Sequence, residues 1–409
     1  MIKAIKFELR KNIKSKKNKL LCLGFIIYVI VFSMSLVYKE KEYDKNQHTV
    51  CEYNLIEYGS IISYNTMLMK GVDDSSELYK KIQKESNFYQ SQHSSDMIIN
   101  RVFSKKIKGH KSLLEDEVNF TKALKIKYAS MKEAYENGVI DDEFLERRGL
   151  SINQVERDIE YIDNLLQSKT PIIVNPYTLN GANFLKNFFT GSNLIIILIF
   201  ILLFTIDSYA LELREDSYKT LYTSPIKRKS ILLSKILASY TLVCFILLMV
   251  LAIAFVVVSL IFGWGKLLYP LSINEGVTNL NPIITNMNQG FIQLYKLIIV
   301  DFVNFMVLVL FVIVFSTSLS VRTNSEMLSF GVLLTIIMLS YIMHSIDAFM
   351  NANRLFNPIY HIFYEDLMSS QLKVNHSYGI LLQLLLSTLI IVITTFKFKN
   401  KDLVGIRGE

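Results

Sequence analysis

One stretch of the chain combines charges, a proline and tyrosines in an order that could carry function. It runs from Arg214 to Lys235, reads REDSYKTLYTSPIKRKSILLSK, and lies between two long apolar runs. Pro225 is excluded from a helix interior but suits the first helical position, and Ser224 suits the N-cap before it. The pattern therefore predicts a helix, a break and a second short helix. Such a rigid basic element is suited to docking on another protein.

The sequence lacks the motifs typical of nucleotide-binding, catalytic and metal sites. GWGK at 263–266 has the wrong spacing for a phosphate-binding P-loop and lacks its hydroxyl residue, and neither HExxH nor GxSxG occurs. The six histidines are scattered, and the three cysteines, Cys22, Cys51 and Cys244, are far apart. We expect no catalytic residue, metal site or cofactor in this chain.

A few polar residues lie close to the ends of apolar runs. They are Asp207, Asp301, Asn304 and His344. Ionisable groups inside a membrane would be typical of an ion-coupled carrier with a proton relay. Because water or lipid headgroups reach the span ends, we expect interfacial or locally paired side chains instead.

The composition indicates that these residues are positioned by membrane-spanning helices. The chain of 409 residues is 51% hydrophobic and 20% charged, whereas soluble domains carry about a quarter charged residues. A bilayer-spanning helix needs ~20 mostly apolar residues. Six segments meet or nearly meet this length: 20–37, 188–206, 236–262, 297–319, 327–346 and 378–396. We predict an all-α polytopic membrane protein with six transmembrane helices and an α-helical extracellular domain inserted between the first two.

The distribution of lysine and arginine predicts the orientation. The net charge is +8, and the excess is concentrated before the first span, between the second and third, and after the last. If the spans alternate, these regions share one side, which the positive-inside rule makes the cytoplasm. Both termini are then cytoplasmic, and nucleic acid is not expected as a partner. The composition suits a bacterial cytoplasmic membrane.

Four regions follow from this topology. Residues 1–19 are predicted to form a cytoplasmic amphipathic interfacial helix, because Ile2, Ile5, Leu9 and Ile13 recur at helical spacing among lysines. Alternatively, the lysines act only as topology signals. Residues 20–37 form the first span, 38–187 the extracellular helical domain, and 188–409 the remaining spans with a cytoplasmic segment at 208–235.

The predicted extracellular domain carries helix signals in its second half. Ser151 and Gln154 form a capping-box pattern, and Leu150 and Val155 are placed for a hydrophobic staple. Apolar stripes predict two long helices, joined by a short one at 142–148, that pack by these faces. The upstream stripe comprises Leu114, Val118, Leu124, Tyr128, Met131 and Tyr135, and it ends at Asn137 and Gly138. We expect the stripes to form a core rather than a ligand groove.

The charged stretch resembles a known family. The order of Glu215, Ser217, Thr220, Leu221, Pro225, Arg228 and Lys235 is similar to a run in permease subunits of type-2 export-class ABC transporters, which usually have glycine where Ser217 stands. In that family the run forms a coupling helix on which the ATPase pushes. The resemblance implies that Glu215 and Arg228 contact the ATPase, that Pro225 sets the turn and that Lys235 is an inner-face anchor. The insert between the first two spans resembles a subgroup with a helical ectodomain.

The resemblance implies the permease subunit of an ATP-driven exporter. Its partners would be cytoplasmic P-loop ATPase subunits, which bind ATP and Mg²⁺, a second permease copy, identical or related, and membrane lipids. The expected substrate is an amphipathic peptide or a lipid-like or toxic compound.

Two other functions remain open. A non-transporting sensor or immunity protein would capture a ligand with its ectodomain and move no substrate. An ion-coupled carrier would transport without an ATPase and would depend on Asp301.

Overall fold

The chain folds into two units that differ in composition and packing. The computed structural model describes residues 2–110, 113–189, 192–206, 228–272, 291–323, 325–344, 356–360 and 376–399. The first unit comprises Met1–Phe32, Phe184–Gly265 and Tyr295–Glu409, and the second comprises Ser33–Asn183 and Lys266–Leu294.

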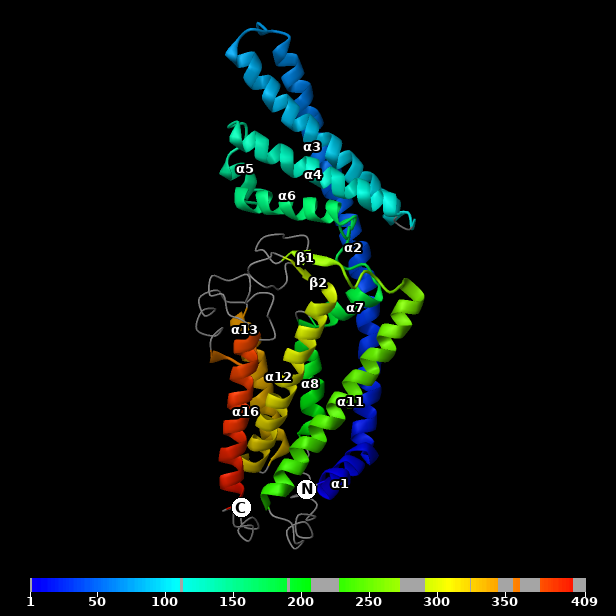
Figure 1. The fold of residues 1–409 in the computed structure, drawn as a ribbon, viewed down its shortest axis with the longest axis vertical. Coiled ribbons are helices and arrows are strands. Elements are labelled where there is room, and N and C mark those ends of the chain that lie inside the picture. Colours follow the sequence, from blue (N-terminus) through cyan, green and yellow to red (C-terminus); the bar gives the residue numbers. More distant parts are fainter. Residues whose placement is uncertain are drawn as a thin grey trace. The chain divides into compact units, whose positions relative to one another are not determined.

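Long apolar helices build the first unit (Figure 1). They are α2 (Lys16–Met69, of which the residues after Phe32 belong to the second unit), α11 (Arg228–Phe262), α12 (Leu294–Thr323), α13 (Glu326–His344) and α16 (His376–Lys399). Each contains a stretch that is long and apolar enough to cross a membrane. The short helix α1 (Ile2–Lys14) precedes them and is separated from α2 by Ser15.

The predicted second span, 188–206, lies almost entirely in the second of two short helices. α7 (Gly181–Phe188) and α8 (Ser192–Thr205) are bent by 70° at a break of at most 4 residues. Across this break the side-chain amide of Asn193 donates to the Asn187 carbonyl at 3.1 Å. The described residues thus hold 5 candidate spans, or 6 if the bent pair is counted as one. The count of six transmembrane helices stays a prediction.

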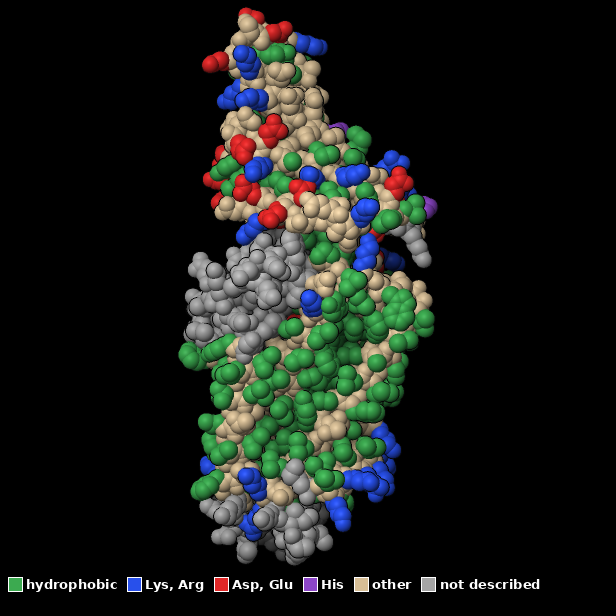
Figure 2. Space-filling view, viewed as in Figure 1, with side chains coloured by type: hydrophobic (Ala, Val, Ile, Leu, Met, Phe, Trp, Pro, Cys, Tyr) green, Lys and Arg blue, Asp and Glu red, His purple; other side chains and the backbone are tan. Residues whose placement is uncertain are grey.

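Much of the surface of the first unit is apolar. Leu260 of α11 is 73% exposed, Met327 of α13 is 88% exposed and Phe396 of α16 is 71% exposed. Figure 2 shows hydrophobic side chains gathered over these helices, with Lys and Arg at the end where α1 lies. Exposure of large apolar side chains in water is unfavourable, whereas in a bilayer they contact lipid tails. This surface is that of a multi-pass membrane protein.

The second unit is a helical domain with its own core. It consists of the later part of α2 with α3 (Glu77–Ile107), α4 (Leu114–Glu136), α5 (Asp142–Glu146) and α6 (Ile152–Gln167). α4 packs against both α3 and α6. One buried cluster comprises Phe88, Met131, Ala134, Ile140, Phe144, Leu145 and Val155. The predicted pair of long helices joined by a short one is therefore confirmed, and α3 is an addition that the sequence analysis did not include.

Local signals set the ends of these helices. The Ser151 hydroxyl accepts from the Gln154 amide at 3.4 Å, and the Gln154 side chain accepts from the Ser151 amide at 2.7 Å, so the predicted capping box is confirmed. Gly138 follows α4 with φ 66°, a left-handed conformation that glycine adopts without strain. Leu150 packs against the buried cluster that includes Val155, and the direct staple contact stays a prediction.

Two details differ from the sequence expectation. On α4 the predicted stripe differs at its start, because Leu114 is 64% exposed and the buried Phe120 and Ala123 were not included in it. The described elements are all helices except β1 (Pro270–Ser272) and β2 (Phe291–Gln293), which pair antiparallel with Leu271 opposite Ile292.

Candidate functional site

Most of the predicted coupling residues lie outside the described part of the chain. These are Glu215, Ser217, Thr220, Leu221 and Pro225, together with Asp207 at the end of the second predicted span. Arg228, the first residue of α11, is exposed, and Lys235 lies two turns further along that helix. The structure therefore shows the two flanks of the segment: the end of α8 and the start of α11.

The flank at the start of α11 is joined to α1 by a buried ion pair. Lys235 Nζ donates to Glu8 Oε1 at 3.0 Å, and the two residues are only 2% and 4% exposed. α1 packs along α11 over this region (Figure 1). Attraction between opposite charges is strong where water is excluded, and each charge would be costly there without the other. The pair therefore fixes how α1 lies on α11.

The other flank, the end of α8, is joined to the start of α2. Lys17 Nζ donates to the Leu203 carbonyl at 2.6 Å. Leu203 is among the last four residues of α8, whose carbonyls have no partner within their own helix, and a cation is favourable at this end of the helix dipole.

The N-terminal segment, which consists of α1 and the start of α2, thus contacts both flanks. Its two helices meet at Ser15, where the Asn18 side chain donates to the Asn12 carbonyl at 3.0 Å. A displacement of either flank is therefore transmitted to one continuous segment.

The structure places the remaining predicted polar residues on two helices. Asp301 and Asn304 lie one turn apart on α12, with Asp301 half-buried and Asn304 buried, and His344 is the last residue of α13. Whether these residues are locally paired or form a proton relay stays a prediction.

Other polar contacts between the spans were not anticipated. The Thr394 hydroxyl of α16 donates to the Ser318 hydroxyl of α12 at 2.7 Å, and Asn357 Nδ2 donates to the Ser340 hydroxyl of α13 at 2.9 Å. Gln383, which is 0% exposed, donates to the Pro358 carbonyl at 3.0 Å. The Thr394–Ser318 bond thus joins two helices directly, and the other two join α13 and α16 to the segment 356–360. Such hydrogen bonds are effective in a bilayer, where no water competes.

Sequence reasoning missed the partners of the coupling flanks, Glu8 and Lys17. For Glu8 a signal was present, because it is the only acidic residue before Glu40 and stands among many lysines. An isolated acid in a basic segment is a candidate for a specific partner. The identity of that partner requires the fold, since Glu8 and Lys235 are 227 positions apart.

Comparison with known proteins identifies one similarity. A family model described as ABC-2 family transporter protein matches residues 3–403. No curated protein and no solved structure matches the chain significantly.

Proposed function

The chain belongs to the ABC-2 family of transporter proteins, and we propose that it is the membrane permease subunit of an ATP-driven exporter. Membership of this family indicates a transport subunit rather than an enzyme, and it implies association with ATPase partners in general. In our proposal the partner binds ATP and Mg²⁺ and pushes on the segment 208–235. Nucleotide does conformational work only if it binds two states of the complex with different affinity.

The observation that supports this proposal is the double attachment of the N-terminal segment. Lys17 bonds to the end of α8 and Glu8 bonds to the start of α11, so both flanks of the proposed coupling element are tied to it. A push on that element would displace the flanks, and the buried pair would pass the displacement to α1. A basic loop that served only as a topology signal would not require this arrangement.

Orientation, assembly and substrate class are part of the same proposal. Both termini are cytoplasmic and the second unit is extracellular, following the distribution of lysine and arginine. Two permeases, identical or related, form the pathway at their interface. The substrate is an amphipathic peptide or a lipid-like or toxic compound, because a lateral route between apolar helices suits such molecules.

Co-purification tests the coupling role. The protein is extracted from its native membrane in mild detergent, and its partners are identified by mass spectrometry. We expect a P-loop ATPase with the wild type and its loss with Pro225→Ala combined with Arg228→Glu. The matched control is Lys229→Glu, which reverses the neighbouring exposed charge on α11 and should retain the ATPase. Absence of an ATPase from every sample would contradict the proposal.

A second variant distinguishes binding of the ATPase from transmission of its movement to α1. Glu8→Gln combined with Lys235→Met removes the buried pair without touching the proposed docking residues. We expect the ATPase still to co-purify, with a changed rate of ATP hydrolysis by the complex. Loss of the ATPase from this variant would show that the pair shapes the docking surface itself.

One observation favours a second candidate function, that of a non-transporting sensor or immunity protein. The second unit has its own core and most of its chain is continuous, at Ser33–Asn183, as expected of a ligand-capturing domain. This function predicts a selective ligand complex, with neither a co-purifying ATPase nor movement of the ligand across vesicles.

A further inference from the structure

A large cavity lies within the second unit. Its volume is about 370 Å³, and its walls come from α2, α3, α4 and α6 with short adjoining segments. Packed protein interiors seldom leave voids larger than a water molecule, whereas small-molecule sites commonly measure ~300–1,000 Å³. Val50 and Arg147 line the cavity and are exposed, so it reaches solvent.

Most of the wall is aromatic or aliphatic. Residues on three helices contribute rings: Tyr43 from α2, Phe103 from α3, and Phe120 and Tyr128 from α4. Tyr161 and Ile162 of α6 close another side. Such a wall suits a ligand with an apolar or aromatic body.

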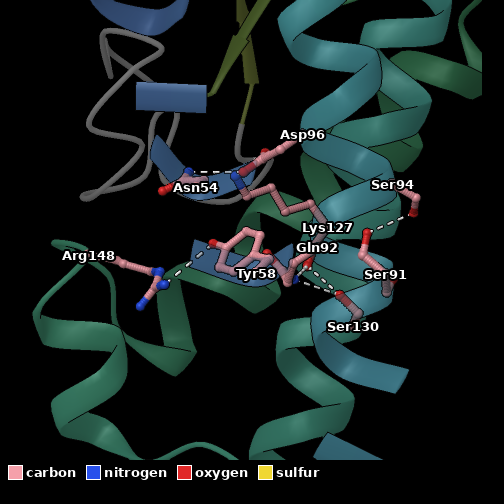
Figure 3. Close-up of polar contacts among 9 residues, drawn as sticks. All are labelled: Asn54, Tyr58, Ser91, Gln92, Ser94, Asp96, Lys127, Ser130 and Arg148. Atoms are coloured by element: carbon pink, nitrogen blue, oxygen red, sulfur yellow. Dashed lines mark hydrogen bonds and ion pairs between the residues drawn. The ribbon is translucent and has the colours of Figure 1, made fainter. Parts of the chain in front are cut away.

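One carboxylate in the wall is fully satisfied by the protein. Asp96 is 0% exposed, accepts from Lys127 Nζ at 2.5 Å and accepts from Asn54 Nδ2 at 2.9 Å (Figure 3). The charge of Asp96 is therefore neutralised by a neighbour from α4, and its second oxygen is bonded from α2. Asp96 therefore does not require a hydrogen bond from a ligand.

Arg148, a positively charged residue in the cavity wall, is also held by contacts within the protein. Its guanidinium donates to the Tyr58 hydroxyl at 3.4 Å (Figure 3). It also lies over the Phe144 ring, with 3.8 Å to the ring centroid.

A second carboxylate in the wall is not satisfied. Asp158 of α6 is 3% exposed, and its Oδ1 is buried without a hydrogen-bond partner in the described part of the chain. Burial raises the pKa of Asp158 to about 7, and the charge of Arg157 lowers it. A buried acceptor of this kind is unfavourable unless something donates to it. Tyr128 and Tyr161 lie near enough to interact electrostatically with it, so aromatic rings adjoin the carboxylate.

We propose that this cavity binds an organic cation, a small molecule whose ammonium group pairs with Asp158 and whose apolar body packs on the surrounding rings. The ammonium supplies an opposite charge to a carboxylate that lines the cavity, and aromatic rings in the wall attract cations further. The cations in the wall already have partners within the protein: Lys127 pairs with Asp96, Arg147 lies 4.0 Å from Glu143, and Arg148 contacts Tyr58 and Phe144. The site does not depend on the exporter proposal, since it lies wholly within the second unit.

Paired probes test the charge. The full chain is placed in phosphatidylcholine nanodiscs at pH 8, and binding of 4-phenylbutylamine and 4-phenylbutan-1-ol is measured by calorimetry, with empty nanodiscs as the control for partitioning. The two probes have the same size, and only the amine is cationic. We expect the amine to bind at least about ten-fold more tightly than the alcohol. No saturable binding of the amine to the wild type would overturn the proposal and leave a cavity that holds only water.

Variants assign the binding to this cavity. Asp158→Asn should weaken the amine by about ten-fold or more and leave the alcohol unchanged. Its matched control is Asp163→Asn, an aspartate on the same helix that is 38% exposed and paired with Lys125, which should bind the amine as the wild type does. Val50→Trp narrows the exposed side of the cavity and should weaken both probes. Equal amine binding by the wild type and Asp158→Asn would refute the assignment.

The wild type alone also provides a test, should Asp158→Asn fail to fold. Lowering the pH from 8 to 6 protonates Asp158, while the amine stays charged. Burial raises the pKa of the neighbouring Tyr128 and Tyr161 hydroxyls, so these two groups do not change charge in this range. Amine affinity should fall with the pH and alcohol affinity should not, and an amine affinity independent of pH would overturn the role of Asp158.

Discussion

Glu8 in the first unit and Asp158 in the second are carboxylates of nearly equal burial in opposite surroundings. Glu8 is 4% exposed and receives the Lys235 ammonium at 3.0 Å. Asp158 is 3% exposed and its Oδ1 receives no donor from the described residues. Burial alone therefore does not distinguish a carboxylate that holds helices together from one that is open to a ligand. The distinction lies in whether another helix brings an opposite charge to it.

Asp96 shows that the second unit can satisfy a buried carboxylate. It lines the same cavity as Asp158 and is bonded by Lys127 and Asn54. The lack of a donor to Asp158 is thus a property of that position and not of the domain as a whole.

The largest predicted effect concerns the buried pair of Glu8 and Lys235. Lys235→Ala should lower the free energy of unfolding by about 3–5 kcal/mol, because Glu8 would keep a buried charge without its ammonium partner. Thermal unfolding of the purified protein in nanodiscs measures the loss.

The double variant Glu8→Gln with Lys235→Met is the control for this prediction. It removes both charges, so stability should return close to that of the wild type. A Lys235→Ala protein as stable as the wild type would show that water reaches Glu8, and the comparison with Asp158 would fail.

The next effect concerns Asp158 and is measured as the pH dependence of the free energy of unfolding. Folded Asp158 keeps its proton up to about pH 7, whereas in the unfolded chain an aspartate loses it near pH ~4. Between these values the folded state binds more protons, so the free energy of unfolding falls as the pH rises, by ~1.4 kcal/mol per unit. From pH 5.5 to 7 the second unit should lose about 2 kcal/mol.

Asp158→Asn isolates this contribution, because asparagine does not titrate. The difference in thermal stability between Asp158→Asn and the wild type should grow from pH 5.5 to 7 in favour of the variant. A difference that stays constant over this range would mean that Asp158 is ionised throughout.

Short-range features of the fold could be predicted from the sequence. The capping box of Ser151 and Gln154 and the stop at Gly138 depend only on neighbouring residues, and the long apolar runs predict helices wherever they occur. On α4 the predicted stripe holds for Tyr128, Met131 and Tyr135 but not for Leu114, and it omits Phe120 and Ala123 because α4 is packed on two sides, by α3 and α6.

The attachments of the N-terminal segment and the surroundings of Asp158 depend on contacts that no local pattern contains. Glu8 meets Lys235 across 227 positions, and Lys17 meets Leu203 across 186. For Asp158 a signal existed, since it lies on the buried face of α6 between Val155 and Ile162. An acid on an apolar face predicts either a partner or a ligand, but only the fold shows that no described residue donates to its Oδ1.

A smaller effect separates the position of Asp158 from its charge. Ser151→Ala removes the N-cap of α6 and should cost about 1 kcal/mol without altering any ionisable group. Thermal unfolding should therefore shift by the same amount at pH 5.5 and at pH 7. Ser94→Ala on α3 is the control, because its exposed hydroxyl donates to the Ser91 carbonyl one turn earlier and its loss should be nearly neutral. A pH-dependent cost at Ser151 would show that the cap influences the ionisation of Asp158.

The smallest predicted effect compares two aspartates on one helix. Asp163 is 38% exposed and its Oδ1 lies 2.6 Å from Lys125 Nζ, so solvent screens the pair and Asp163→Asn should change the free energy of unfolding by no more than ~0.5 kcal/mol. The change should be the same at pH 5.5 and 7. Thermal unfolding of Asp163→Asn beside Asp158→Asn tests both statements. A pH-dependent effect of Asp163→Asn would mean that the pH dependence of stability does not belong to Asp158 alone. If the effect is independent of pH, the pH dependence is assigned to Asp158, the buried carboxylate that lines the cavity.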